Sequence, residues 1–196
     1  MNNGSTDDTA EIARAKGATV LLEERKGYGS ACLKGMAYIQ DKPADRQPDI
    51  VVFIDGDYSD YPEQMRELIR PIVEEGYDMV IGSRARGKRI RGSMAPQQIF
   101  GNWLATNMIR VLFGARFSDL GPFRAITWRS LQDLKMRDTN YGWTVEMQVK
   151  AAKQKLRFTE IPVDYRPRIG VSKVTGTVKG TVMAGYKIIT TILKYY

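Results

Sequence analysis

Ile50-Val51-Val52-Phe53-Ile54-Asp55-Gly56-Asp57 is the clearest structural signal in the chain. Five apolar, mostly β-branched residues predict a buried strand, and two carboxylates stand where that strand ends. Ligands of open α/β sheets bind at the carboxyl ends of strands, and paired carboxylates suit Mg²⁺ or Mn²⁺ bridging to phosphate oxygens. An ordinary Asp-Gly turn is the alternative. The strand before the motif, and Asp60 and Pro62 after it, favour a metal site.

Further apolar runs flank this strand and alternate with helical patterns. Residues 18–22 and 77–81 predict two more strands, and residues 28–40 and 62–75 predict the helices between them. Strands that alternate with helices imply right-handed crossovers and a parallel sheet. We therefore expect an α/β fold.

The ends of the chain extend this pattern. Ser5, with Asp8 three residues later, predicts the capped start of a helix that runs to Lys16. After the third strand, periodicity predicts helices at 96–113, 142–153 and 181–196 and strands at 123–126 and 156–163. We expect one domain over residues 1–175, followed by a C-terminal amphipathic helix over residues 176–196.

Composition excludes several chemistries. The 196 residues contain no histidine and one cysteine, Cys32. Triads that contain histidine, zinc sites with histidine ligands and an internal disulfide are therefore excluded. The lone cysteine and the absence of a signal-peptide pattern lead us to expect a cytoplasmic protein.

The net charge of +8 is unevenly distributed along the chain. Residues 1–83 hold 9 basic and 16 acidic side chains, whereas residues 150–196 hold 10 basic side chains against Glu160 and Asp164. A fold that brings these parts together would form a cleft in which carboxylates bind a cation and arginines bind an anion.

Four further segments carry candidate functional groups. Arg84 ends the next strand and begins a basic loop, residues 84–91, which is either a solvated loop or an anion-binding flap. Residues 119–124 combine a turn with Asp119 and Arg124, and Glu146 is an acid in an apolar helix, either a general base or a partnered glutamate. Residues 165–173 are rich in anion donors, with a solvated linker as the alternative.

Six of these motifs together resemble the inverting family-2 glycosyltransferases of GT-A fold, in the branch similar to dolichyl-phosphate mannose synthase and polyprenyl-phosphate sugar synthases. They are residues 3–9, 55–57, 82–84, 119–124, 142–146 and 168–173. The resemblance implies a Rossmann-like, mostly parallel sheet flanked by helices. It also implies transfer of a sugar from a UDP- or GDP-linked donor to a polyprenyl or dolichyl phosphate, with Mg²⁺ or Mn²⁺ and with inversion.

The resemblance also implies roles for individual residues. Asp57 and Asp55 would hold the metal, and Asp55 would also lie at the ribose and diphosphate. Arg84 and Asp119 would contact substrate, and Glu146 would act as base toward a hydroxyl acceptor. The anionic acceptor or the leaving diphosphate would be held by Arg124, Arg168, Ser172 and Lys173. Where the family often has glutamine after the carboxylate motif, this chain has Ser59 followed by Asp60.

The start of the chain departs from the family. Its members begin with a strand and a nucleobase-binding loop that have no counterpart here, so we expect a chain shortened at its N-terminus. Completion by a partner chain is one alternative. A non-catalytic binding or assembly subunit is another. Strand edges left exposed would favour a homo-oligomer.

The C-terminal helix bears on the acceptor. Lys179, Lys187 and Lys194 fall on one side of a helix, and six apolar residues supply the surface around them: Val182, Met183, Tyr186, Ile189, Leu193 and Tyr196. Such a helix suits peripheral contact with the cytoplasmic face of a membrane, and closure of the domain's own core is the alternative. No basic-aromatic module of a nucleic-acid-binding protein is present, so we expect no nucleic-acid partner.

Overall fold

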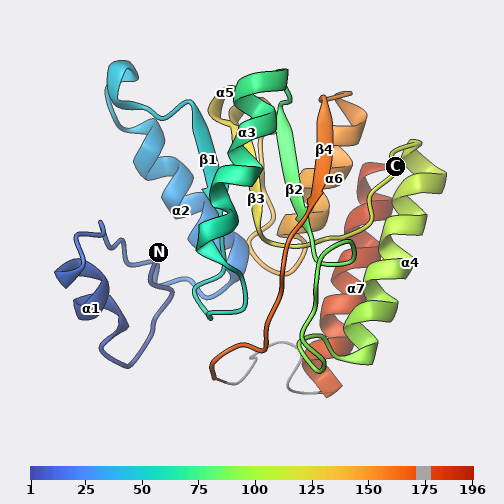
Figure 1. Ribbon diagram of the computed structural model, residues 1–196, viewed down its shortest axis with the longest axis horizontal. Helices are drawn as coiled ribbons and strands as arrows, with labels where there is room; N and C mark the ends of the chain where they lie inside the picture. The colour runs from blue at the N-terminus through green and yellow to red at the C-terminus, as the bar shows by residue number, and fades with distance from the viewer. Residues whose placement is uncertain (171–177) are drawn as a thin grey trace. The chain divides into compact units, whose positions relative to one another are not determined.

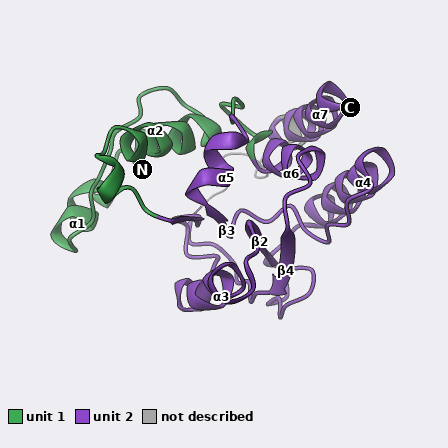
Figure 2. Ribbon diagram, turned by 90° about the horizontal axis from the view of Figure 1, so that it is seen from above, with its two compact units in different colours: residues 1–48, 136–143 green, residues 49–135, 144–196 purple. Residues whose placement is uncertain are grey.

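The structure, a computed structural model, describes residues 1–170 and 178–196. The chain divides into two compact units, coloured separately in Figure 2. Unit 1 comprises residues 1–48 and 136–143, and unit 2 comprises residues 49–135 and 144–196. Every candidate site residue that the structure describes belongs to unit 2.

Unit 1 is largely helical. It contains α1 (Thr9–Ala15), α2 (Tyr28–Gln40) and a 3₁₀ turn, η1 (Ala44–Arg46). The predicted strand at residues 18–22 is wrong: in the described residues this segment forms only one parallel bridge, between Leu22 and Asn2. An apolar run becomes a strand only where a neighbouring backbone pairs along its length, and Asn2 supplies a partner at a single point.

The predicted start of the first helix is also wrong. α1 begins at Thr9, and the carboxylate of Asp7 accepts hydrogen bonds from the backbone N–H and the hydroxyl of Thr9. The backbone N–H of Ser5 instead donates to the Asn2 side chain. The side chains of Asn2 and Asp7 thus form local hydrogen bonds that fold the segment before the helix into a turn, as Asn and Asp commonly do.

Unit 2 is built on a sheet whose four strands, within the described residues, are β1 (Ile50–Phe53), β2 (Met79–Ser83), β3 (Arg124–Thr127) and β4 (Phe158–Pro162). Their spatial order is β1-β3-β2-β4. β2 and β4 pair in parallel, and β3 pairs antiparallel with both β1 and β2 (Figure 1). The α/β fold is thus confirmed, but the expected parallel sheet is mixed. β3 lies between β1 and β2 and runs antiparallel to both, so β1 and β2 are not direct neighbours.

Helices cover both faces of this sheet. A 3₁₀ turn, η2 (Pro62–Gln64), leads into α3 (Met65–Glu75) on one face, and α5 (Trp128–Asp133) and α6 (Trp143–Lys153) lie on the other (Figure 2). Leu68 and Ile72 of α3 pack against Val80 and Ala125 of the sheet. α5 was not predicted. It starts because the hydroxyl of Thr127 accepts the backbone N–H of Ser130.

α4 (Pro96–Phe113) and α7 (Val178–Tyr195) complete unit 2 and lie side by side (Figure 1). Their C-terminal ends meet where the rings of Phe113 and Tyr196 contact edge to face, with centroids 6.1 Å apart. None of the helices in the described part of the chain is long and apolar enough to cross a membrane.

Candidate functional site

The carboxylate motif forms a tight turn at the C-terminal end of β1. One carboxylate oxygen of Asp57 accepts the backbone N–H of Ser59 at 3.0 Å and also the Ser59 hydroxyl. Tyr58, between them, has a φ of 68°, which is unusual for a bulky residue. The turn therefore fixes Asp57 by one oxygen and leaves the other, Oδ2, for a positively charged partner.

Residues 164–169, which we call the strap, run alongside this turn. The backbone N–H of Arg166 donates to the carbonyl of Ser59 at 3.1 Å, and that of Ile169 donates to the carbonyl of Asp57 at 2.9 Å. The Arg166 guanidinium lies 3.3 Å and 4.2 Å from the ring centroids of Tyr58 and Tyr61. These contacts bring Arg168 to Asp57, where its nitrogen lies 3.1 Å from Oδ2.

Asp60 is the most unusual acid of the site. Only 2% of it is exposed, and neither carboxylate oxygen has a hydrogen-bond partner among the described residues. Burial, and next the negative charge of Asp55, raise the pKa of Asp60 from 3.8 to about 7, although the charge of Arg84 opposes this shift. A buried carboxylate without a partner beside two further acids is an environment that a divalent cation would stabilise.

The acids of unit 2 do not form a closed metal cage. In residues 1–170 and 178–196, no three Asp, Glu or Cys side chains converge on one point. A Mg²⁺ or Mn²⁺ ion at Asp57 would therefore need oxygen ligands from a bound molecule, as a diphosphate supplies. The residues present fit an ion that the protein and its substrate hold together.

Arg84 and Asp119, both predicted substrate contacts, are paired with each other. The Arg84 side chain donates to the two Asp119 oxygens at 2.7 and 2.9 Å, and its backbone N–H donates to the same carboxylate at 2.7 Å. Burial alone would lower the pKa of Arg84, but the carboxylate of Asp119 outweighs burial and raises that pKa above its usual value. Arg84 is thus a permanently charged group in a fixed orientation, and its contact with phosphate remains a prediction.

Glu160 of β4 holds this pair in place and was not predicted. Its carboxylate accepts the backbone N–H of Ser118 at 2.9 Å and the Ser118 hydroxyl at 2.7 Å. Asn102 of α4 accepts the backbone N–H of Leu120 at 2.8 Å. The signal in the sequence that could have identified Glu160 was an acidic residue inside a predicted strand. A charged side chain in such a position needs a nearby partner.

Arg124 is buried and bonded to carbonyl oxygens. Its guanidinium donates to the carbonyls of Gly121, Leu120 and Thr144, each at 3.1 Å. A Cβ on Gly121 would lie 2.9 Å from the carbonyl oxygen of Gly82, so only glycine lets this loop approach β2 so closely. Arg124 therefore orders the loop that carries Asp119, and its contact with an acceptor remains a prediction.

Glu146 is fully buried within unit 2. Its carboxylate accepts the hydroxyl of Tyr195 at 2.6 Å and pairs with Lys150 at 2.7 Å. These contacts match the alternative interpretation, a partnered glutamate between α6 and α7. The role of general base remains untested, as do the roles of Ser172 and Lys173, which lie outside the described residues.

The basic loop packs against the strap instead of extending freely into solvent. The backbone N–H of Ile90 donates to the carbonyl of Tyr165, and the backbone N–H of Lys88 donates to the Asp164 carboxylate, at 3.0 and 3.1 Å. A Cβ on Gly87 would lie 1.9 Å from the Val163 carbonyl, so glycine is required there. The loop keeps Lys88, Arg89 and Arg91 exposed while its backbone is held.

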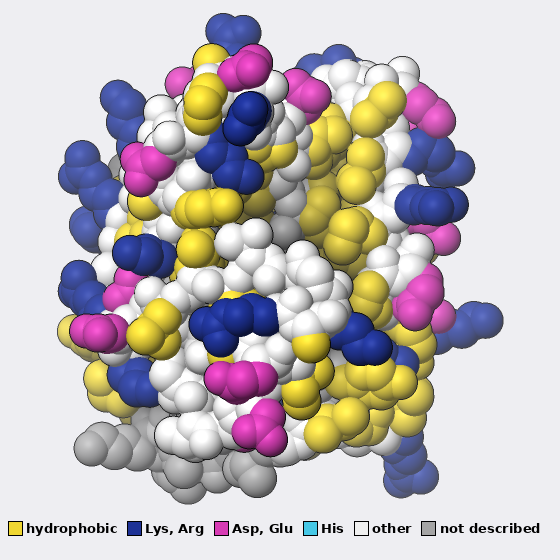
Figure 3. All heavy atoms as spheres, turned by 90° about the vertical axis from the view of Figure 1, so that its left-hand side faces the viewer, with side chains coloured by type: hydrophobic (Ala, Val, Ile, Leu, Met, Phe, Trp, Pro, Cys, Tyr) yellow, Lys and Arg dark blue, Asp and Glu magenta, His cyan; other side chains and the backbone are white. Residues whose placement is uncertain are grey.

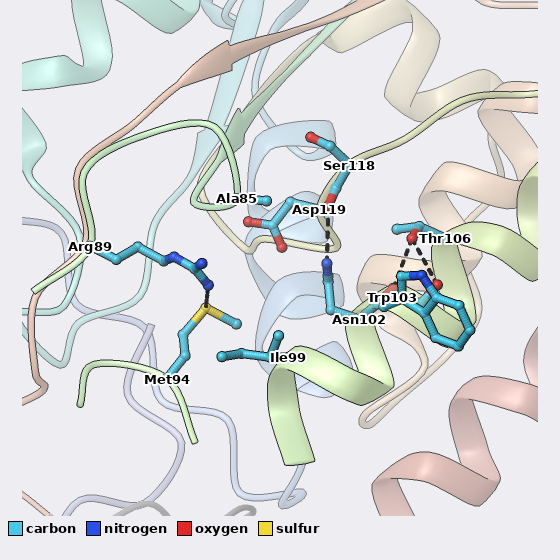
Figure 4. A pocket seen from close by; sticks show the side chains of 9 residues that line it. All are labelled: Ala85, Arg89, Met94, Ile99, Asn102, Trp103, Thr106, Ser118 and Asp119. Atoms are coloured by element: carbon cyan, nitrogen blue, oxygen red, sulfur yellow. Dashed lines mark hydrogen bonds between the residues drawn. The ribbon is translucent and has the colours of Figure 1, made fainter. Parts of the chain in front are cut away.

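A pocket of about 290 Å³ opens between the basic loop and α4 (Figure 4). Met94, Ile99 and Trp103 supply an apolar wall, whereas Arg89 and Asp119 supply charge. The Asn102 side chain donates to the carbonyl of Ser118 at 3.0 Å and closes one side. The pocket therefore places its apolar wall beside Asp119, the partner of Arg84.

Known proteins are similar to this chain in sequence and in fold. Residues 1–148 match the model of glycosyl transferase family 2. An uncharacterized glycosyltransferase of Mycobacterium tuberculosis is 34% identical over 190 residues, which cover 94% of this chain and 80% of the relative. A dolichyl-phosphate hexose transferase of Haloferax volcanii is 30% identical over 174 residues, 88% of this chain and 71% of the relative.

One solved structure gives the same result for the fold. The crystal structure of Mycobacterium tuberculosis glucosyl-3-phosphoglycerate synthase with Mn²⁺, UDP-glucose and phosphoglyceric acid superposes with a TM-score of 0.69 at 22% identity. The match covers 98% of this chain and 65% of that one. The predicted fold is thereby confirmed, and the family match shows that the chain belongs to glycosyl transferase family 2, a family of glycosyltransferases.

Proposed function

We propose that this chain transfers a sugar from a nucleoside-diphosphate sugar to an anionic acceptor, with inversion and with Mg²⁺ or Mn²⁺ at Asp57. The observation that carries the proposal is the acid cluster after β1, in which Asp57 presents one oxygen and the buried Asp60 carboxylate has no hydrogen-bond partner within the described part of the chain. The Mycobacterium tuberculosis synthase crystallised with Mn²⁺ and UDP-glucose supports the same donor and metal.

The reaction is a displacement at the anomeric carbon. The acceptor oxygen forms a bond to that carbon while the bond to the diphosphate breaks, and the electron pair leaves with the diphosphate. A bound divalent cation would supply charge stabilisation for this leaving group. Arg84, fixed by Asp119, supplies further positive charge without reorganisation, which is how preorganised groups lower a barrier. Arg168 adds a second positive charge beside Asp57.

The need for a base depends on the acceptor. A phosphate oxygen is already ionised, so no protein group has to take a proton. A hydroxyl acceptor would need a base, and Glu146 is the candidate by sequence motif although it is buried against Lys150 and Tyr195. The burial of Glu146 supports an ionised acceptor.

We favour a polyprenyl or dolichyl phosphate as the acceptor. Between Asp78 and Asp119 the chain has no acidic residue and seven basic ones. One of them, Arg89, lines the apolar pocket, where Trp103 is 58% exposed and Ile99 is 45% exposed. An apolar wall beside positive charge suits a molecule with a phosphate and a hydrocarbon chain, and the Haloferax relative supports this class of acceptor.

Peripheral contact with a membrane at its cytoplasmic face follows from such an acceptor. α7 exposes Val182, Met183 and Tyr186 in its first half and buries Thr191 and Ile192 in its second. Both interpretations of this helix thus have support, each for a different half. On the face in Figure 3, by contrast, basic and acidic side chains are interspersed. Vesicle flotation with and without residues 177–196 tests the contact, and unchanged flotation of the shortened chain would contradict it.

Donor binding is the direct test of the proposed function. Titration of UDP- and GDP-sugars should show binding that requires Mn²⁺ and that is lost in Asp57→Ala. The second candidate is a non-catalytic binding or assembly subunit of the same family. Absence of donor binding with Mn²⁺ present would favour it.

A further inference from the structure

We propose that the Arg168 guanidinium occupies the cation's place on Asp57, and that a divalent cation displaces it and frees it to bind the diphosphate. The inference rests on the proposed function, because it assigns an order to the cation and diphosphate of that site. Its physical content is a competition between two cations for one carboxylate oxygen.

The geometry of Asp57 sets up this competition. Oδ1 is already used by the backbone and hydroxyl of Ser59, and Oδ2 has the Arg168 nitrogen at 3.1 Å. A Mg²⁺ or Mn²⁺ ion on Oδ2 would lie roughly 2.1 Å from that oxygen, hence within about 5 Å of the guanidinium nitrogen. Like charges at this distance repel, so the two cations exclude each other.

Arg168 differs from Arg84 in how firmly it is held. The Arg84 side chain forms two hydrogen bonds to Asp119 and is 12% exposed. Among residues 1–170 and 178–196, the Arg168 side chain forms one ion pair, to Asp57. It is 33% exposed, and the Asp57 side chain is 21% exposed. Arg168 can therefore leave its partner at low cost, because solvent is available to both groups.

The backbone beneath Arg168 is nevertheless held in place. Ile169 donates to the Asp57 carbonyl, and two neighbouring tyrosine rings hold the Arg166 guanidinium. Release from Oδ2 therefore swings the Arg168 side chain while its Cα stays beside the turn. A freed guanidinium at this place is suited to bidentate contact with phosphate oxygens.

The acids around Asp57 explain why Arg168 binds there at all. The negative charges of Asp55 and Asp57 both raise the pKa of Asp60, so the three acids repel one another in the absence of a cation. Arg168 offsets part of this repulsion. A divalent cation offsets more of it, and the guanidinium is then no longer required.

The inference predicts opposite effects of one substitution on two affinities. Arg168→Met removes the competitor, so Mn²⁺ alone should bind several-fold tighter than to the wild type. The same variant lacks the group that turns to the diphosphate, so UDP should bind about tenfold more weakly at saturating Mn²⁺. The Arg168 guanidinium weakens the binding of the divalent cation to Asp57, whereas the bound divalent cation strengthens the binding of the diphosphate. Binding linkage allows both couplings at one site.

The experiment measures Mn²⁺ binding by electron paramagnetic resonance of the free ion, and UDP binding by calorimetry, on the full chain. Arg129→Met is the matched control, because it removes one exposed arginine of unit 2 from a helix away from the turn. It should change neither affinity. Arg168→Lys keeps the charge. Its affinities for Mn²⁺ and for UDP should each lie between those of the wild type and Arg168→Met.

Several results would overturn the proposal. Mn²⁺ affinity that is unchanged or weaker in Arg168→Met removes the competition, and unchanged UDP affinity removes the second role. If the wild type binds Mn²⁺ and UDP but Arg168→Met shows no opposite effects, only this inference fails. If the wild type binds neither, the proposed function fails and takes the inference with it.

Discussion

Arg84 and Asp119 stand 35 residues apart in the sequence and meet in a bidentate ion pair that leaves Asp119 1% and Arg84 12% exposed. Asp119 also accepts the backbone N–H of Arg84, so the carboxylate fixes both the end of β2 and the side chain that follows it. The Arg84 guanidinium is thus oriented by Asp119, which belongs to another segment of the chain.

Asp119→Asn should destabilise the fold, because it leaves the charge of Arg84 buried and unpaired. We expect a loss of about 3 kcal/mol in the free energy of unfolding, measured by urea denaturation. The double variant Arg84→Met/Asp119→Leu should be more stable than Asp119→Asn alone. A double variant that is less stable would contradict this view of the pair.

Glu160→Gln should weaken the support of the same pair. The carboxylate of Glu160 accepts two hydrogen bonds from Ser118, and its amide replacement loses their charge assistance. We expect about 1–2 kcal/mol of destabilisation in thermal or urea unfolding. Ser118→Ala should give a comparable loss, and the two losses should not add, because both variants break the same contact.

Asp60 should make the stability of the metal-free protein depend on pH. Its pKa in the folded state is about 7, above the ordinary 3.8, so the folded state binds this proton more tightly than the unfolded state. The free energy of unfolding should therefore fall as pH rises from 4 to 7, by about 4 kcal/mol at most relative to Asp60→Asn. The free energy of unfolding of the wild type and of Asp60→Asn is measured by urea denaturation at each pH. If it falls equally with pH in both proteins, Asp60 does not cause the decline.

Glu146→Gln separates the two interpretations of this residue. The variant breaks the charge pair with Lys150 and should lower the free energy of unfolding by about 1–3 kcal/mol. At a temperature where the variant is folded, transfer to a phosphate acceptor should survive, because that acceptor needs no base. Transfer to a hydroxyl acceptor should be abolished if Glu146 is the general base. Equal effects on both acceptors would remove the catalytic role.

Trp103→Ser should act on the acceptor and not on the donor. The side chain lines the apolar wall of the pocket, so its loss should weaken transfer to a long-chain prenyl phosphate several-fold in KM. Binding of UDP with Mn²⁺ should not change. Val111→Ser, on the same helix and 81% exposed, is the control. An equal effect of both variants would place the acceptor's chain elsewhere.

Most helices and strands of unit 2 follow from local sequence. The helix at residues 96–113 has the predicted bounds because Pro96 starts it and Gly114, at a φ of 69°, ends it. The strand before Asp55 was predicted from its apolar, β-branched run, but the residues of β1 are half-buried and not fully buried as expected. The predicted strand at residues 18–22 failed because pairing depends on a second backbone, which local periodicity does not report.

The candidate residues were chosen in part from the sequence, and their roles in binding and transfer remain predictions. The carboxylate motif, Arg84 and Arg168 were recognised by residue type and by their positions after strands or in the basic strap. Glu160 and Asn102 were missed because their roles depend on which loop lies beside them. Glu146 and Arg124 were recognised by motif, but their burial and their hydrogen-bond partners are results of packing between segments 20 to 49 residues apart.

The sequence by itself determined the family, the α/β class and the position of Asp55 and Asp57 at the end of β1, because these depend on residue type and local periodicity. Only the tertiary structure decided that β3 lies antiparallel between β1 and β2, that Asp119 pairs with Arg84, and that Arg168 pairs with Asp57. The physical reason is that charge and hydrogen-bond partners are chosen by proximity in space. Proximity follows from the packing of the whole unit, in which each ion pair competes with water and with every other group within reach.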